Sequence, residues 1–168
     1  MKEAIKSFLT KHIVPYVFSL THQKLLFREL LKANKAYDDG LTLEGNIPGF
    51  RLKIGRAYLV FIIGLHTALI PLVAIFHKWL AKIDCHALIV LSVVLTWVFF
   101  VSFSIFRTLL VDLVAKKIIT QAWEIHFPHF DYEKYHKLVS RLYGEAVEKE
   151  LPKKELELFI INGIVTEK

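Results

Sequence analysis

Two long apolar stretches without charge constrain the fold of this chain more than any other feature. Residues 57–76 and residues 87–106 each span 20 positions that lack a formal charge. At a rise of about 1.5 Å per residue, a helix of this length covers the roughly 30 Å hydrocarbon core of a bilayer. Soluble helices of this length are rarely apolar on every face. The sequence therefore predicts an all-α membrane protein in which two transmembrane helices form a hairpin.

The remaining boundaries follow from charge, glycine and proline. The chain is 54% hydrophobic yet 23% charged, so its apolar residues are gathered in blocks. We expect an amphipathic, interfacial and cytoplasmic segment at 1–55, a first transmembrane helix at 56–80 and a short outer turn at 81–86. The second transmembrane helix then continues as a cytoplasmic extension over 87–127 and stops before Pro128, and residues 128–168 form a helical cytoplasmic tail.

The N-terminal segment is expected to contain two amphipathic helices and a loop. Residues 3–13 place apolar side chains on one helical face, and Thr21 is a plausible N-cap for a second helix that reaches about Lys35. Residues 37–50 contain three glycines and a proline. They predict a loop that re-enters the membrane interface at Phe50.

The tail is expected to contain two helices. Asp131 can cap the first, and Pro152 stands at the start of the second. Asn162 and Gly163 are expected to end that last helix, although the same residues are also typical of a β-hairpin turn.

Lysine and arginine predict the orientation. Basic residues flank both spans on the terminal sides, whereas the connection 77–86 carries only Lys78 and Lys82 together with Asp84. The excess of positive charge on the cytoplasmic side then places both termini in the cytoplasm, and short basic soluble parts favour a bacterial inner membrane. The single Cys85 lies in the outer turn, either as a small residue at the membrane edge or as a bridge between two copies.

A basic stripe on the second N-terminal helix predicts contact with lipid headgroups. With a formal net charge of +6, the chain suits anionic lipids, which attract each nearby cation by about 1 kcal/mol. No base-stacking pattern accompanies the stripe, so nucleic acid is not an expected partner. The stripe falls in one narrow helical sector and consists of Lys24, Arg28, Lys32 and Lys35.

His66 is the titratable residue nearest the middle of the first span, and Pro71 follows five residues later. Ionisable groups inside a membrane are candidates for function. One interpretation is a neutral imidazole that donates to a backbone carbonyl or to the neighbouring span. Another is a pore-lining or helix-contact group, and a third is a haem ligand whose second histidine comes from another copy. The candidate pore or contact residues are His66, Thr67, Ser92 and Thr96.

A metal site is a weaker hypothesis. His126, His129, Asp131 and His136 offer ligand types that suit zinc, but Pro128 separates the first two, and solvated side chains are the alternative interpretation. Histidines around the outer turn give a second loose candidate. We find no motif for a catalytic nucleophile, so no catalytic residue and no cofactor are expected.

These observations favour a small non-enzymatic integral membrane subunit that assembles with itself or with a larger membrane complex. Two spans bury little surface against each other, and lipid supplies no hydrophobic drive between them. An oligomeric membrane pore or effector and a haem-binding membrane redox subunit are the alternative hypotheses.

Overall fold

A computed structural model of the chain describes residues 9–19 and 24–167, and most of these residues are helical. Two compact units are formed. The first, here called the hairpin unit, comprises residues 1–17 and 52–110. The second, here called the head unit, comprises residues 18–51 and 111–168. Each unit thus combines segments that are distant in the sequence.

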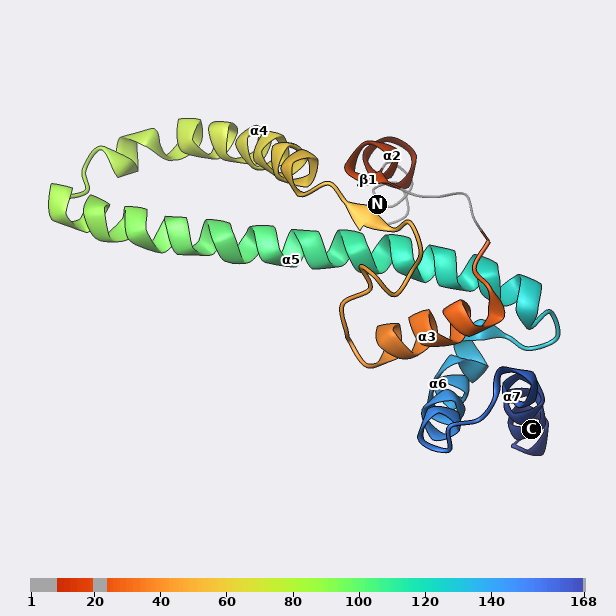
Figure 1. The fold of residues 1–168 in the computed structure, drawn as a ribbon. Coiled ribbons are helices and arrows are strands. Elements are labelled where there is room, and N and C mark those ends of the chain that lie inside the picture. Colours follow the sequence, from red (N-terminus) through yellow and green to blue (C-terminus); the bar gives the residue numbers. More distant parts are fainter. Residues whose placement is uncertain (1–8, 20–23, 168) are drawn as a thin grey trace. The chain divides into compact units, whose positions relative to one another are not determined.

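The hairpin unit is built on two long apolar helices, α4 (Ile54–Leu80) and α5 (Cys85–His126) (Figure 1). Both are long and apolar enough to cross a membrane, and their apolar windows are not buried by the rest of the chain. Pro71 lies inside α4 without ending it. As the sequence predicts, α5 is continuous for 42 residues, and it ends two residues before Pro128. Its last part, from residue 111, belongs to the head unit.

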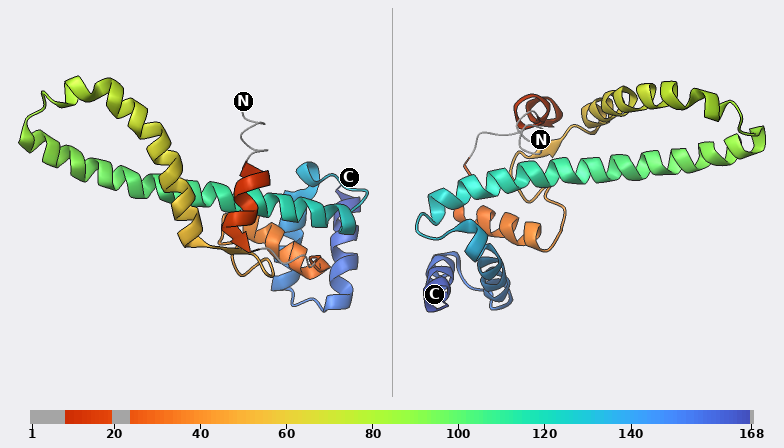
Figure 2. Two further views of the ribbon diagram at one scale, coloured as in Figure 1. Left: turned by 90° about the horizontal axis from the view of Figure 1, so that it is seen from above. Right: turned by 180° about the vertical axis from the view of Figure 1, so that it is seen from behind.

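Aromatic rings join α4 to α5 near the start of α4. Tyr58 packs edge-on against Phe99 and Phe103, with ring centroids 6.1 Å and 5.4 Å away. Phe61 contacts Phe99, Phe103 and Phe106 at 5.4–5.5 Å. Figures 1 and 2 show the two helices apart between this crossing and their connecting loop.

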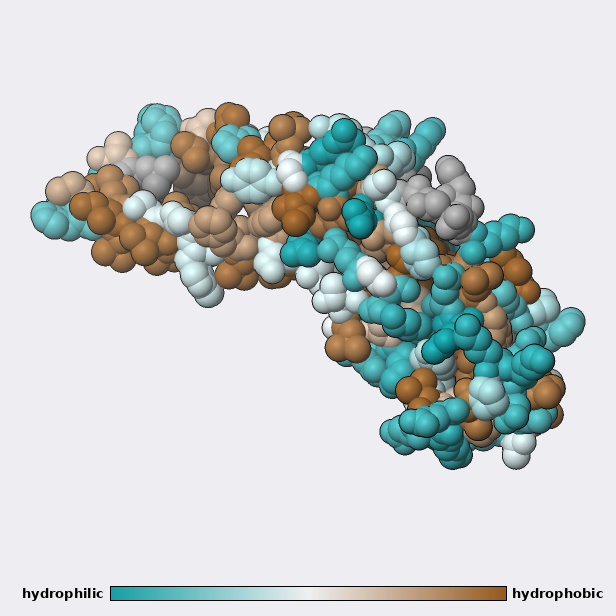
Figure 3. All heavy atoms as spheres, viewed as in Figure 1, coloured by the Kyte–Doolittle hydropathy of each residue, from teal (hydrophilic) through white to brown (hydrophobic). Residues whose placement is uncertain are grey.

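The surface of the hairpin is correspondingly apolar. Toward the loop, Phe76 on α4 remains 49% exposed, and Trp97 on α5 remains 67% exposed. Hydrophobic residues gather over the hairpin in Figure 3, whereas hydrophilic residues dominate the surface of the head unit. The two helices therefore leave most of their apolar surface open to a surrounding medium or partner.

A short N-terminal segment packs at the beginning of α4. It consists of a π-helical turn, η1 (Leu9–Ile13), followed by α2 (Val14–Val17). Val17 and Ala57 are fully buried between α2 and α4. The backbone N–H of Lys53 donates to the Val17 carbonyl at 2.8 Å. Of the amphipathic helix expected at 3–13, residues 3–8 lie outside the described residues.

The head unit contains α3 (Phe27–Asp38), the end of α5, α6 (Tyr132–Glu148) and α7 (Lys153–Thr166). Two short strands, β1 (Phe18–Ser19) and β2 (Arg51–Leu52), pair with each other. Helix α6 packs against both α3 and α7. The core is apolar, and its most deeply buried side chains include Leu30, Leu31, Ile119, Trp123, Val139 and Ile160. As expected, Asp131 caps α6, because its carboxylate accepts a hydrogen bond from the Glu133 backbone at 2.8 Å.

Two expectations for the N-terminal segment are wrong. Residues 24–26 are not helical, so α3 begins at Phe27, where the Glu29 carboxylate accepts from the Leu26 backbone N–H at 2.9 Å. The expected cap Thr21 lies outside the described residues. Phe50 is not an interface residue: it is 2% exposed and stacks on Phe18 with 5.1 Å between ring centroids. Its loop folds into the core of the head unit.

The end of the last helix is also different from the expectation. Asn162 and Gly163 neither stop α7 nor form a β-hairpin, since the helix continues to Thr166. Gly163 faces Leu142 of α6, and a β-carbon at this position would lie 2.6 Å from the Leu142 Cδ1 atom. Its role is close helix packing, which the local sequence does not reveal.

Candidate functional site

The four polar side chains that the sequence singles out in the two spans are hydrogen-bonded to their own helix. His66 Nδ1 lies 2.8 Å from the Ile62 carbonyl oxygen, and the Thr67 hydroxyl donates to the Ile63 carbonyl at 2.8 Å. The Ser92 and Thr96 hydroxyls donate to carbonyls three and four residues earlier on α5. These bonds satisfy the polar atoms without a neighbouring helix. The contact of His66 Nδ1 with a backbone carbonyl is one of the arrangements expected from the sequence.

A carbonyl oxygen only accepts, so the His66 ring donates from Nδ1 in this contact. The second ring nitrogen, Nε2, takes no part in this bond. The side chain is exposed on α4, so any partner of Nε2 must approach from outside the helix.

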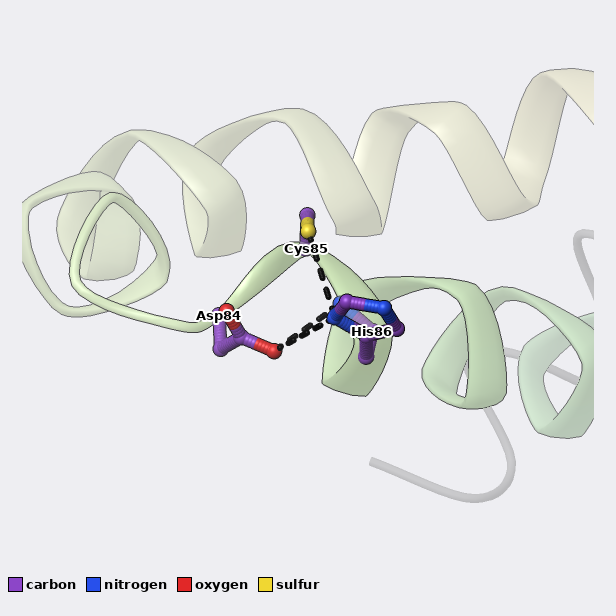
Figure 4. Close-up of side chains that lie close together, drawn as sticks. All are labelled: Asp84, Cys85 and His86. Carbon is purple, nitrogen blue, oxygen red and sulfur yellow. Dashed lines mark hydrogen bonds and ion pairs between the residues drawn. The ribbon is translucent and has the colours of Figure 1, made fainter.

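Three possible metal ligands follow one another where the α4–α5 loop meets α5: Asp84 ends the loop, and Cys85 and His86 begin α5 (Figure 4). The ligand atoms of Asp84, Cys85 and His86 lie within 4.8 Å of one another, and all three residues are exposed. His86 Nδ1 is 3.2 Å from the Asp84 carboxylate and 3.5 Å from the Cys85 sulfur. His77, at the end of α4, bonds the Ala74 carbonyl instead. A carboxylate, a thiol and an imidazole are suitable ligands for zinc, but in this structure the three side chains contact one another.

The residues considered for a metal site near the end of α5 have separate partners. His126 Nε2 lies 2.8 Å from the Leu25 carbonyl, and His136 Nδ1 lies 2.8 Å from an Asp38 carboxylate oxygen. His129 is exposed, and Asp131 caps α6. Among the described residues, Asp84, Cys85 and His86 are the group of three that lies close enough to share an ion. The structure does not bring these four side chains together.

A buried polar cluster instead connects α3 with α6. The side chains of Asp38 and His136 are 12% and 15% exposed. Asn34, which is fully buried, donates from Nδ2 to the His136 backbone carbonyl at 2.8 Å and to Asp38 at 3.4 Å. Tyr132 stacks on the His136 ring at 4.9 Å. The cluster links residues that are about 100 positions apart, so hydropathy patterns could not find it, although an asparagine on the apolar face of α3 was a signal.

Two atoms of this cluster have no hydrogen-bond partner among the described residues. They are the Asn34 side-chain oxygen and the Tyr132 hydroxyl, and both are buried. Because the Asn34 nitrogen already donates twice, turning the amide over would break good hydrogen bonds. A buried polar atom without a partner costs about 1–3 kcal/mol.

Burial and charge shift several pKa values around this cluster. Burial, and then the negative charge of Asp38, raise the pKa of Tyr132, and burial raises that of Tyr37. Both phenols are therefore neutral at physiological pH. Lys116 and Glu133 form an ion pair at 2.8 Å. Their hydrogen bond raises the pKa of Lys116 and lowers that of Glu133.

The basic stripe lies in the head unit. Lys24, Arg28 and Lys32 are exposed. Lys24 precedes α3, so the stripe does not lie wholly on one helix, and Lys35 is half-buried and pairs with Asp39 at 3.1 Å. The lipid contact of the stripe stays a prediction. Comparisons of the chain with protein-family models, with curated proteins and with solved structures find no match.

Proposed function

We propose that the chain is a non-enzymatic integral membrane subunit whose hairpin crosses the bilayer and assembles with copies of itself or with a larger membrane complex. One observation carries this proposal: α4 and α5 expose apolar side chains around their surfaces and contact each other through aromatic rings near one end. Contact of this apolar surface with water would cost about 25 cal/mol of free energy per Å². In a bilayer it is solvated by lipid tails.

Assembly follows from the loose packing of the two spans. Helices in a membrane associate through close packing and interhelical hydrogen bonds, since lipid supplies no hydrophobic drive. Most of the surface of α4 and α5 is not used for packing within the chain. It is free to contact helices of other chains.

In the proposed orientation, both termini and the head unit lie in the cytoplasm of a bacterium, and the hairpin crosses its inner membrane. Basic residues at the terminal ends of both spans support this orientation. The loop at Asp84–His86 then lies on the outer side.

Fractionation and native mass measurement test the proposal. The full-length chain should stay with the membrane pellet after a carbonate wash, because its apolar helices cannot leave lipid without detergent. In mild detergent, its native mass should exceed that of one chain, or affinity capture should recover a partner membrane protein in fixed ratio. A chain released by carbonate would contradict membrane insertion, and a detergent-solubilised monomer without a partner would contradict assembly.

The same preparation separates the alternative functions. A ring-sized homo-oligomer that releases dye from liposomes would favour a pore over the proposed subunit. A Soret absorbance band would favour a haem-binding redox subunit with His66 as the candidate ligand.

A further inference from the structure

The positive charge of the chain is unevenly divided between its two units. In the head unit, basic and acidic residues occur in nearly equal numbers. In the described part of the hairpin unit, Asp84 is the only acidic residue, and it lies in the loop. The net charge of the chain is therefore concentrated at the ends of the apolar helices, which is where lipid headgroups would lie.

Two cations lie at the terminal end of α4, where the apolar span begins, and a third lies on the segment that leads into α2. Lys53 precedes α4, Arg56 lies in its first turn, and Lys11 comes from η1, which continues into α2 beside α4. All three are exposed, and within the described residues none forms an ion pair. We call these three residues the basic collar.

The structure holds Arg56 in place by two contacts to Tyr16. Arg56 Nη1 donates to the Tyr16 carbonyl at 3.2 Å, and the guanidinium carbon lies 5.0 Å from the centre of the Tyr16 ring. A guanidinium has five N–H donors, so this bond leaves others for a phosphate oxygen. Tyr16 and Tyr58 are each partly exposed beside the collar, and tyrosines are enriched at the same depth as headgroups.

From these contacts we propose that the basic collar binds the headgroup of an anionic phospholipid. The inference depends on the proposed insertion of the hairpin, because insertion brings the collar to headgroup depth. The apolar helix directly below the collar would hold the acyl chains, which a soluble phosphate lacks. The head-unit stripe is the less suitable site, since its Lys35 is already paired with Asp39.

Native mass spectrometry of the full-length protein in mild detergent tests this proposal. The protein is mixed with equal amounts of phosphatidylglycerol and phosphatidylcholine, and retained lipids are counted. The wild type should retain phosphatidylglycerol preferentially. Each lost cation should weaken its binding about fivefold, so Lys11→Gln, Lys53→Gln and Arg56→Gln together should weaken it about a hundredfold.

A matched variant carries the same change of charge in the head unit, away from the basic stripe: Lys137→Gln, Lys153→Gln and Lys154→Gln together. It should retain phosphatidylglycerol like the wild type. Arg56→Lys, which keeps the charge, should also bind. If the triple collar variant does not fold, the single variants Lys11→Gln and Lys53→Gln, whose side chains form no ion pair among the described residues, give the same comparison at about fivefold each.

Three outcomes would overturn the inference. The first is equal retention of both lipids, the second is equal loss in both triple variants, and the third is displacement of the lipid by millimolar inorganic phosphate. Each would show that the collar does not bind a lipid headgroup specifically. The last outcome would identify a site for free phosphate instead. A protein that stays in carbonate-washed membranes but shows one of these results leaves the proposed function intact, whereas release by carbonate contradicts the proposed function itself.

Discussion

The hydroxyl of Tyr132 is buried in the head unit without a hydrogen-bond partner among the described residues. Its ring is well used, because it stacks on His136 and packs against Trp123 at 5.3 Å. The ring thus stabilises the junction of α5 and α6, while the buried hydroxyl opposes that stabilisation.

Tyr132→Phe should therefore stabilise the head unit. It removes the buried hydroxyl and keeps the ring, so we expect the free energy of unfolding to rise by about 1 kcal/mol. Thermal unfolding followed by circular dichroism in mild detergent measures the change. Tyr135→Phe is the matched control, because the Tyr135 hydroxyl is not among the buried atoms without a partner. A lower melting temperature for Tyr132→Phe alone would show that the hydroxyl has a stabilising partner.

Alkaline pH should destabilise the head unit through the same residue. The pKa of Tyr132 is raised in the folded state, chiefly by burial, above its ordinary value of 10.0. The contribution of the Tyr132 proton to the free energy of unfolding is fully present below pH 10. It decreases as the pH rises further, because the unfolded chain releases the proton first. Between pH 10 and 11.5, the melting temperature of Tyr132→Phe should fall less steeply than that of the wild type. Parallel curves would contradict this role of Tyr132.

At the residue scale, local patterns predict caps but not distant partners. Asp131 precedes a helical pattern, and it caps α6 as expected. The contact of His136 with Asp38 joins residues 98 positions apart, and nothing in either local sequence specifies the other. His136 was therefore considered as a metal ligand, although its Nδ1 atom is used to connect α3 to α6.

Helix α7 packs closely against α6 at a single glycine. A β-carbon at Gly163 would lie 2.6 Å and 2.9 Å from the two terminal carbons of Leu142, which is itself buried. The two helices can approach this closely only because position 163 lacks a side chain.

Gly163→Ala should loosen this contact. Overpacking costs about 1–3 kcal/mol, and the higher helix propensity of alanine returns up to about 1 kcal/mol. We expect a net loss of about 1 kcal/mol, or a melting temperature several degrees lower. Gly144→Ala is the control on α6, since its β-carbon would meet only the flexible end of Lys35 at 3.4 Å. Equal stability of the two variants would mean that Leu142 moves aside without cost.

At the element scale, the long helices were predictable and the short ones less so. Uninterrupted apolar sequence and a proline at position 128 specify α5 almost to the residue. The beginning of α3 and the end of α7 were predicted incorrectly, because tertiary contacts decide whether a polar or glycine-containing turn stays helical. The packing of Gly163 against Leu142 is such a contact.

At the scale of the whole molecule, the two-unit organisation was not predicted. Hydropathy separates the chain into consecutive segments, whereas the head unit combines residues 18–51 with residues 111–168. Residues 18–51 and 111–168 thus form one folded unit with its own core, which neither segment could form alone. The excess of basic over acidic residues falls in the hairpin unit. The total net charge of +6 does not reveal this uneven distribution.

Cys85 is the only cysteine in the chain, and its exposed position at the start of α5, directly after the α4–α5 loop, makes it a reporter of the proposed topology. A membrane-impermeant maleimide added to intact spheroplasts should label Cys85, because the loop is expected on the outer side. In a Cys85→Ser background, a cysteine introduced by Lys154→Cys on exposed α7 should be labelled only after the membrane is permeabilised. The opposite pattern would invert the orientation. Labelling of both positions before permeabilisation would place the loop and the head unit on the same side, and the two apolar helices would then not cross the bilayer.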